Sequence, residues 1–566
     1  MTADTPTASE TDAAAGPAVP PATLAGPAQP PAARRGSLIR SSMIFSSLSL
    51  VSKFMGLARD LVITAKLGAS GTIEADAYNT ALAFPNLFRR IFAEGAFASA
   101  FVPAYARALE RDGEEKADVL AADAMATLAA ATIALTLVAQ LTMPWLMYVI
   151  NPGYAHDPAK FKLAVLLTQI SMPYLPCMAI YAHLSGVLQA RGKFAITALA
   201  PTLLNLFMLA AVLPQKNAHA GAVAASWAIL GAGVAQAALL SWGVHRSGAK
   251  VHWRLPRLTP DIRALIMLAV PGAIAGSATQ INIFISSLLA SYVAGARSWL
   301  AVCDRLYQLP ISLVAVAIGV ALLPRLSRAV HAGDKADAQA TMDQAIVFCL
   351  ALSLPAAAAL TAMPYYLIDG LFTRGAFTHY DAQQTAAALF AYGWGVPAFV
   401  LKRILEPAFF ARQDTKAPMR FALISVVVNI VLGVILFKIV GVWGIAAATS
   451  VATWVNVGQM VTSLARRGVY TPTPRTWSRL ARLAVASGAL GLLLALASHF
   501  RALIEAPVGG IHLGPLHAKE LVILGLMALA GAAYPVLLFA SGGLTLTEAR
   551  GALRRRASDP PPPPLP

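Results

Sequence analysis

Charged side chains recur inside segments of the chain that are otherwise long and apolar. Placing one charge at the centre of a bilayer costs about 2.5–3.5 kcal/mol on insertion scales, so seven cations would cost on the order of 20 kcal/mol. Such residues are therefore expected to face a water-filled cavity or one another rather than lipid. Seven cations and four acids occupy these positions: Lys53, Arg59, Arg89, Arg90, Arg305, Lys402 and Arg403, with Asp60, Glu94, Asp304 and Glu406.

Two of the cations have an acid four residues further along the chain. Arg90–Glu94 and Lys402–Glu406 have this spacing, which places both members of a pair on one face of a helix. Each pair suits an internal salt bridge as well as a ligand-binding role, and the sequence leaves both interpretations open.

Three arginines lack an acid at helical spacing. Arg59 and Arg305 adjoin Asp60 and Asp304, but sequence neighbours on a helix point about 100° apart. Snorkelling at a helix end would explain one such arginine, whereas three of them in both halves of the chain favour a central cationic cavity. The guanidinium fork matches phosphate oxygens. The sequence therefore predicts that Arg59, Arg89 and Arg305 bind a phosphate or pyrophosphate.

Membrane-spanning helices must position these charges. Of the 566 residues, 57% are hydrophobic and 13% are charged, whereas soluble domains carry about 25% charged residues. The predicted fold class is all-α integral membrane, with about fourteen transmembrane helices of the roughly 20 residues that cross a bilayer. The predicted spans are residues 40–66, 76–105, 120–150, 162–190, 194–214, 219–245, 264–293, 298–324, 342–369, 383–411, 418–438, 441–464, 480–500 and 519–541. Charges interrupt the first, second, eighth and tenth spans, which lowers their hydropathy.

Lys and Arg are distributed unequally between the two sides of these spans. If the N-terminus is cytoplasmic, the inner loops and tails hold 28 of the 44 Lys and Arg residues, the outer loops hold nine, and seven lie within spans. Cytoplasmic loops carry the excess in membrane proteins. The prediction is a multi-pass protein of the cell inner membrane with both termini cytoplasmic. The net charge of +17 then needs no nucleic-acid partner, which would require the cations to gather on one domain.

The chain repeats itself at an offset of 221 residues. AFVPAYARAL at 100–109 aligns with ALLPRLSRAV at 321–330, and Ala190-Arg191 aligns with Ala411-Arg412. Two bundles of about six spans in one orientation are typical of transporters. We expect a disordered cytoplasmic tail, two six-helix lobes, a final helix pair and a second disordered tail, at residues 1–36, 37–250, 251–470, 471–545 and 546–566.

Several motifs resemble those of the MurJ (MviN) lipid II flippase family, part of the MOP exporter superfamily that also includes MATE drug exporters and polysaccharide flippases. The N-terminal signature contains PNLFRR, IFAEGAF and AFVP, and LFTRGAF follows in the second half. The resemblance covers roughly residues 40–541, and its motifs lie at 56–105, 173–194, 303–328, 371–377 and 406–418.

This resemblance implies two six-helix lobes around a cationic cavity, with the last two helices forming a groove for a polyprenyl tail. It implies export of an undecaprenyl-pyrophosphate-linked disaccharide pentapeptide, lipid II, to the periplasmic leaflet by alternating access. We expect a monomer among membrane lipids that is not an enzyme and binds no cofactor. The substrate-binding positions implied are Lys53, Arg59, Arg89, Arg305, Asp60, Asp76, Glu94 and Asp304.

Two positions depart from the family pattern. The position four residues after Asp304 is often Glu in the family and is Gln308 here, so an acidic role there is absent. Some members have Asn and Asp four residues apart in the eleventh span, in a sodium-binding pattern. Here Asn429 is followed by Gly433, so no metal site is expected despite Thr449.

The sequence also bears on four alternative functions. A flippase for another polyprenyl-linked oligosaccharide of the same superfamily fits the charges equally well. A membrane glycosyltransferase would need acidic metal or base residues, and a drug exporter would need an acidic, aromatic pocket, whereas this set of charges is mainly cationic. Kinked, charged helices in two repeats are less typical of an ion channel than of a transporter whose two halves rock against each other. The absence of a GxxxxGK[ST] motif argues against direct use of ATP.

Overall fold

Helices form almost all of the structure, a computed structural model that describes residues 32–89, 97–317, 322–412, 414–508 and 518–542. No strand occurs in these residues, and the predicted all-α class is confirmed. Nine of the helical segments described are long and apolar enough to cross a membrane. The tails beyond residues 32–542, expected to be disordered, lie outside the described part of the chain.

The first half of the chain forms the helices that will be called the N-terminal bundle. These are α1 (Ala32–Leu67), α2 (Ile73–Arg89), α3 (Phe97–Arg111), α4 (Glu114–Ile150), the 3-10 turn η2 (Pro152–His156), α5 (Pro158–Ser171), α6 (Tyr174–Ala190), α7 (Phe194–Val212) and α8 (Ala218–Arg246). Helix α1 begins at Ala32, inside the tail predicted for residues 1–36.

The second half begins with α9 (Pro260–Ala290) and continues with the C-terminal bundle and the C-terminal hairpin. The C-terminal bundle comprises α10 (Ala296–Ala317), α11 (Leu323–His331), α12 (Lys335–Ala362), α13 (Pro364–Phe372), α14 (His379–Gly393), α15 (Val396–Phe410), α16 (Lys416–Val440) and α17 (Val442–Arg466). The hairpin comprises α18 (Pro474–His499), α19 (Arg501–Glu505), the 3-10 turn η4 (Ala506–Val508) and α20 (Ala518–Ala540).

Each predicted span coincides with one of these helices or with two consecutive ones. The interruptions within spans have a local cause. Pro173 precedes α6, Pro364 begins α13, and Pro397 lies in the first turn of α15. Proline lacks a backbone N–H donor and clashes with the preceding turn, so the helix before it ends. Interrupting charges were expected to lower the hydropathy of the first, second, eighth and tenth spans. The tenth is nevertheless among the nine apolar segments and the first is not, whereas the second and eighth include residues outside the described part of the chain.

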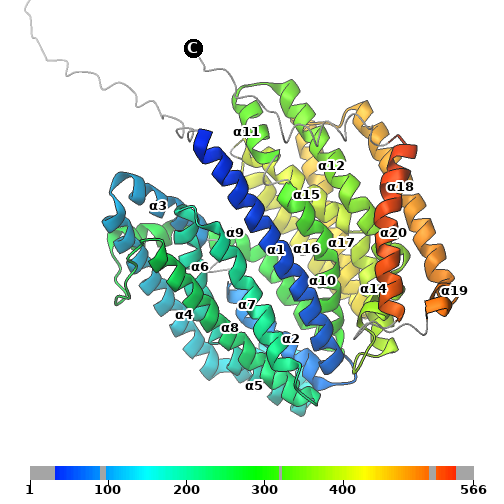
Figure 1. The fold of residues 1–566 in the computed structure, drawn as a ribbon, viewed down its shortest axis with the longest axis horizontal. Helices are drawn as coiled ribbons and strands as arrows, with labels where there is room; N and C mark the ends of the chain where they lie inside the picture. The colour runs from blue at the N-terminus through cyan, green and yellow to red at the C-terminus, as the bar shows by residue number, and fades with distance from the viewer. Residues whose placement is uncertain (1–31, 90–96, 318–321, 413, 509–517, 543–566) are drawn as a thin grey trace, which may run out of the picture.

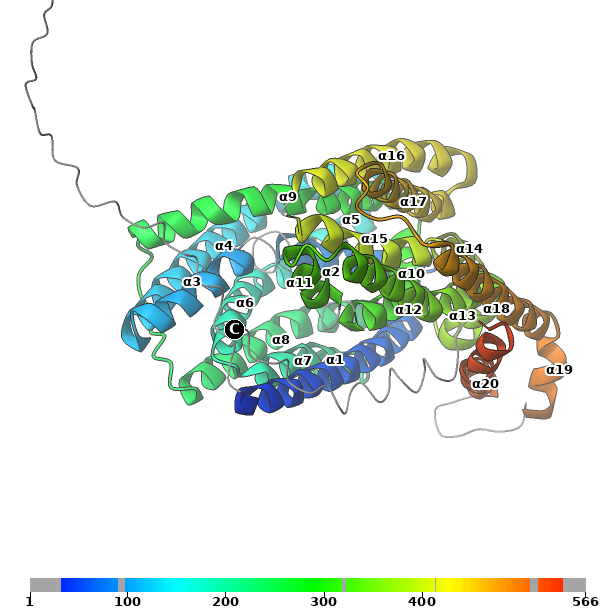
Figure 2. The same ribbon diagram turned by 90° about the horizontal axis from the view of Figure 1, so that it is seen from above.

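The two bundles lie side by side, with α1 along the boundary between them (Figures 1 and 2). Helix α1 packs on α7 of its own bundle and also contacts α10 and α13 of the other. Helix α9 contacts α3 and α4 as well as α16, so it joins the bundles. The C-terminal hairpin lies on the side away from the N-terminal bundle, where α18 packs on α12 and α20 on α13.

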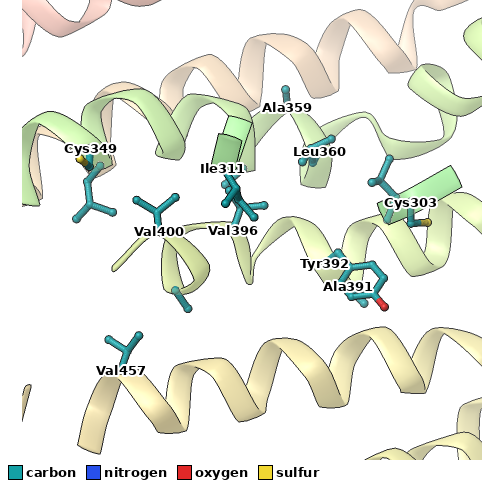
Figure 3. Close-up of a cluster of buried hydrophobic side chains, with 14 of the residues drawn as sticks. Cys303, Ile311, Cys349, Ala359, Leu360, Ala391, Tyr392, Val396, Val400 and Val457 are labelled. Carbon is teal, nitrogen blue, oxygen red and sulfur yellow. The ribbon is translucent and has the colours of Figure 1, made fainter. Parts of the chain in front are cut away.

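Apolar side chains from several helices meet inside the C-terminal bundle. Figure 3 shows Cys303 and Ile311 of α10 near Tyr392 of α14 and Val396 and Val400 of α15. All of these side chains are buried. This packing fixes the position of α10, which carries the charged residues of the site on its other side.

Candidate substrate-binding site

One carboxylate joins the two bundles at the centre of the charged region. Asp60 of α1 accepts hydrogen bonds from Nε and Nη2 of Arg59 at 2.9 and 2.6 Å, both on Oδ1. Its second oxygen, Oδ2, accepts a hydrogen bond from Nε of Arg305 on α10. The Asp60 carboxylate therefore bridges a cation of the N-terminal bundle and a cation of the C-terminal bundle.

Arg59 is fixed further by α7. The third guanidinium nitrogen, Nη1, donates to Oδ1 of Asn205 at 3.0 Å. The Asn205 amide nitrogen in turn donates to the backbone oxygen of Ser52 at 2.9 Å. Arg59 is only 4% exposed, and all three of its nitrogens have partners. In this arrangement the Arg59 charge is held by Asp60 and Asn205.

The expectation that Arg59 and Arg305 lack an acidic partner is wrong. The Cα–Cβ directions of neighbouring helix residues do diverge, but the long Arg59 side chain folds back on Asp60. Asp60 still reaches Arg305 across the helix interface. Among the described residues, the two Nη groups of Arg305 donate no hydrogen bond, and its side chain is about one-third exposed. Arg305 is therefore the more accessible of the two cations.

A cavity of about 80 Å³ lies beside this ion-pair cluster, between α1, α2 and α10. Arg59, Asp60 and Arg305 line it together with apolar side chains such as Ile63 and Leu82. Pockets that hold drug-sized ligands measure about 300–1,000 Å³, so this cavity is small by comparison. A sugar-linked diphosphate would need a different arrangement of the bundles.

Further cations extend the charged region between α1 and α15. Lys53 is half-buried and forms no ion pair with any described side chain, and Arg403 lies close enough to repel it electrostatically. Lys402 and Glu406 form the predicted pair four residues apart, with 3.8 Å between Nζ and Oε1. The charge of Lys402 is thus partly neutralised, whereas Lys53 and Arg403 add to the cationic character of the region.

Asp304 of α10 forms hydrogen bonds within its own helix. Its two carboxylate oxygens accept hydrogen bonds from the hydroxyl of Tyr307 and the amide of Gln308, the latter at 2.9 Å. Tyr307 stacks on Tyr392 and Phe399, so Asp304 is connected through Tyr307 to α14 and α15. The Gln308 position, where the family often has an acid, serves here as a donor to Asp304.

Asp76 also lies outside the central cluster. It is fully buried and pairs with Lys160 of α5 at 2.5 Å. It also accepts hydrogen bonds from the backbone N–H of Gly295 and from both the N–H and the hydroxyl of Ser298. Because Gly295 and Ser298 belong to the α9–α10 region, Asp76 links the two bundles rather than lining an open cavity.

Other contacts close the same end of the molecule, here called the α1–α2 end after the turn at residues 68–72. Asp381 of α14 accepts hydrogen bonds from the N–H and hydroxyl of Ser70 and from Nε1 of Trp299. The N–H of Ala376 donates to the backbone oxygen of Ala65 at 2.8 Å. The bonds made by Ser70 and Ala65 join residues that are 311 positions apart and seal the bundles together.

Glycine is required where the backbones meet at this end. Gly68 has φ +71°, and a Cβ there would lie 2.7 Å from the backbone oxygen of Ala376. Gly295 has φ +82°, and a Cβ there would lie 2.7 Å from the backbone nitrogen of Ser70. Any side chain at these positions would push the bundles apart.

Three expected residues cannot be placed in the site. Arg89 is the last residue of α2, and its side chain lies outside the part of the chain that the structure describes. Arg90 and Glu94 fall in residues 90–96, which are also outside it. Their predicted salt bridge and the role of Arg89 remain expectations.

At the position of the doubtful sodium site, two amides contact each other. The amide nitrogen of Asn429 on α16 donates to Oδ1 of Asn282 on α9. Thr449 donates to the backbone oxygen of Ile445 at 3.0 Å, and Gly433 supplies no side-chain ligand. Within the described residues, no group of three His, Cys, Asp or Glu residues could hold a metal ion.

The sequence indicated the cations but not all of their partners. Asn205 is not among the predicted site residues, although a buried amide in an apolar span signals a polar neighbour. Lys160 and Arg297 were expected in outer loops. Both are buried instead, Lys160 against Asp76 and Arg297 against Asn151.

The fold is similar to that of solved transporters. A structure described as lipid II flippase MurJ in an inward closed conformation matches with a TM-score of 0.71 and 22% identity, over 91% of this chain and 99% of that one. An inward-facing MATE family transporter of the MOP superfamily matches with a TM-score of 0.59 and 14% identity, over 75% of this chain and 98% of the other. These similarities establish the fold.

Sequence comparisons are more specific. The chain is 38% identical to a probable lipid II flippase MurJ of Rhizobium meliloti (strain 1021), over 92% of this chain and 97% of the relative. It is 32% identical to the lipid II flippase MurJ of Burkholderia cenocepacia, over 77% and 86% of the two chains. The family model for lipid II flippase MurJ matches residues 63–506. The chain therefore belongs to the lipid II flippase MurJ family.

Proposed function

We propose that this protein moves lipid II, the undecaprenyl-pyrophosphate-linked peptidoglycan precursor, from the cytoplasmic to the periplasmic leaflet of the inner membrane. Two close relatives carry the lipid II flippase name, and the charged region described above suits a pyrophosphate. The work is transport rather than catalysis, and the protein acts as a monomer.

The Asp60 bridge between Arg59 and Arg305 is the observation on which this proposal rests. A pyrophosphate presents several anionic oxygens, so it can replace the single Asp60 carboxylate as the partner of both guanidinium groups. Exchange of Asp60 for substrate breaks an ion pair between the bundles. Substrate binding thereby favours a state with a different separation of the bundles, because a ligand shifts a conformational equilibrium by its differential affinity for the two states.

The seal at the α1–α2 end supports alternating access. Under the inside-positive distribution of Lys and Arg, this end faces the periplasm and both termini face the cytoplasm. The seal made by Asp76 and Asp381 then blocks exit to the periplasm in the state observed. Opening it while closing the opposite end would release the substrate outwards.

The domain organisation suits alternating access. Residues 37–250 and 251–470 form two six-helix lobes that move relative to each other, and residues 471–545 carry the pair of helices beside the polyprenyl tail. The C-terminal hairpin moves with the second lobe, because α18 and α20 pack on α12 and α13. Ion pairs of Asp369 with Arg501 and Lys519 strengthen this attachment.

Complementation tests the proposal. Cells depleted of their own lipid II flippase would express this chain, and lipid II in the outer leaflet would be measured with an enzyme that cleaves only exposed lipid II. We expect growth and outer-leaflet lipid II to return. Growth without outer-leaflet lipid II, or accumulation of a different polyprenyl-linked oligosaccharide outside, would contradict the proposed substrate.

A further inference from the structure

The segment between α8 and α9, residues 247–259, is an ordered linker without helix or strand. Its first part is fixed by Asp118, whose Oδ2 accepts a hydrogen bond from the backbone N–H of Lys250 at 2.7 Å. Its last residue, Thr259, caps α9 by accepting a hydrogen bond from the N–H of Ile262 at 3.3 Å. The linker is therefore held at both ends, and in both views it runs along the left margin of the molecule (Figures 1 and 2).

Three large apolar side chains of the linker have no place in the protein core. Trp253 is 66% exposed, Leu255 is 80% exposed and Leu258 is 69% exposed. They lie within six residues of one another, and Arg254, Pro256 and Arg257 separate them. A soluble surface rarely exposes such a cluster without a partner.

Cations alternate with these apolar residues. Arg254 and Arg257 are both exposed, and Lys250 lies just before them. Arg254 is 3.9 Å from Oδ1 of Asp123, with about two-fifths of its side chain exposed. At that distance the pair leaves most of the arginine's donors available. Among the linker residues 247–259, none is acidic.

The position of the linker along the membrane normal follows from its neighbours. Helices α8 and α9 both correspond to predicted spans, so a connection between them lies where the acyl chains meet the headgroups. The linker contacts Asp118, which also pairs with Arg191 at the end of α6. On the orientation given under the proposed function, this is the cytoplasmic surface of the inner leaflet, where anionic lipids attract Lys and Arg.

We propose that residues 250–258 form a binding site for anionic phospholipids of the inner leaflet. Trp253, Leu255 and Leu258 enter the interfacial region, where tryptophan is enriched in membrane proteins. Arg254 and Arg257 bind the lipid phosphates through their guanidinium groups. The bound lipid anchors the start of α9, the helix that contacts both bundles.

Lipid titration of the full-length chain in detergent tests the charged half of the site. Phosphatidylglycerol would be added to the wild type and to the double variant Arg254→Gln, Arg257→Gln. At about 1 kcal/mol per cation near an anionic surface, we expect roughly thirtyfold weaker binding in the variant. The matched control is Arg111→Gln with Lys116→Gln, two exposed cations at the end of α3 and in the first turn of α4, which should leave the affinity unchanged.

A second readout tests the apolar half. The chain would be reconstituted in nanodiscs with brominated phosphatidylcholine, and fluorescence quenching compared between wild type and Trp253→Phe. The difference in fluorescence between the two proteins reports Trp253 alone, and we expect the brominated lipid to quench it strongly. An unquenched difference, equal lipid affinity in the double variant, or displacement of phosphatidylglycerol by inorganic phosphate would overturn the inference. Because neither assay measures flipping, the inference can fail while complementation succeeds, and the two failures are distinguishable.

Discussion

Asp60 of α1 and Arg305 of α10 form an ion pair between the two bundles, through Oδ2 and Nε. The same carboxylate binds Arg59 through Oδ1. One negative charge thus lies between two positive ones, and the group retains a net positive charge. Such a site attracts an anion, while Asp60 neutralises part of the charge of the two arginines.

Loss of either arginine should abolish transport. Arg59→Ala and Arg305→Ala each remove charge-assisted hydrogen bonds worth about 1.5–3 kcal/mol, so we expect at least about a tenfold loss of flipping and no complementation. Arg305→Lys should retain part of the activity, because lysine keeps the charge but not the bidentate fork.

Expression and position in the cell must be checked for each of these variants. Lys53→Arg serves as the conservative control, since both side chains carry a cation, and it should complement fully. Full complementation by both alanine variants at normal expression would show that the arginines do not bind the substrate.

Asp60→Asn should separate binding from turnover. Removal of the competing carboxylate leaves Arg59 and Arg305 without an anionic partner, so a diphosphate should bind about tenfold more tightly, equivalent to roughly 1.4 kcal/mol. Flipping should slow, because the ion pairs of Asp60 with the two arginines can no longer re-form when the substrate is released to the periplasm. Titration with a soluble sugar diphosphate would measure the affinity. A weaker affinity in Asp60→Asn would mean that Asp60 supports the ligand rather than competing with it.

Asp381→Ala should open the α1–α2 end. The change removes the acceptor for Ser70 and Trp299 and shifts the population towards a state open at this end. The readout is alkylation, from outside the cell, of a cysteine introduced at the fully buried Ala69. We expect faster labelling than in the parent Ala69→Cys chain.

The control for this prediction is Asp337→Ala, which breaks a half-exposed ion pair with Arg325 at the opposite end of the molecule. Labelling at position 69 should not change in that variant. Equal labelling rates in the Asp381 variant, the Asp337 variant and the parent would exclude Asp381 from the seal.

Replacement of sodium by potassium should leave flipping unchanged. Asn429 and Asn282 bond to each other, and no carboxylate in the described part of the chain joins them, whereas a cation in a membrane usually has an acidic partner. Collapse of the membrane potential should slow flipping, since the potential contributes about 2.3 kcal/mol per charge per 100 mV. Proteoliposomes at clamped potential allow both tests. Loss of flipping on sodium removal alone would contradict this prediction.

Much of the fold could be predicted because each span must bury its backbone hydrogen bonds in one apolar segment. The spans carrying Arg59 and Arg305 have weak hydropathy, yet the internal repeat and the charge distribution still located them. Contacts between distant helices were not predictable. Asp76 illustrates this, since its partners Lys160 and Ser298 lie 84 and 222 residues away.

Part of the site could also be predicted from the sequence. The cost of a charge in an apolar segment identifies Arg59 and Arg305 without knowledge of their neighbours. Helical direction alone wrongly separated Asp60 from Arg59, because a long flexible side chain can fold back on its neighbour. The role of Asn205 depends on the packing of α7 against α1, which the sequence does not contain.

The most direct test of the central claim is transport in proteoliposomes with purified protein and fluorescent lipid II. The fraction of lipid II accessible to an external quencher or cleaving enzyme would be followed for the wild type, Arg305→Ala and Lys53→Arg. The account predicts rapid exposure of lipid II by the wild type and by Lys53→Arg, and none above protein-free vesicles by Arg305→Ala. Equal exposure by all three proteins, or none by a correctly folded wild type, would contradict it.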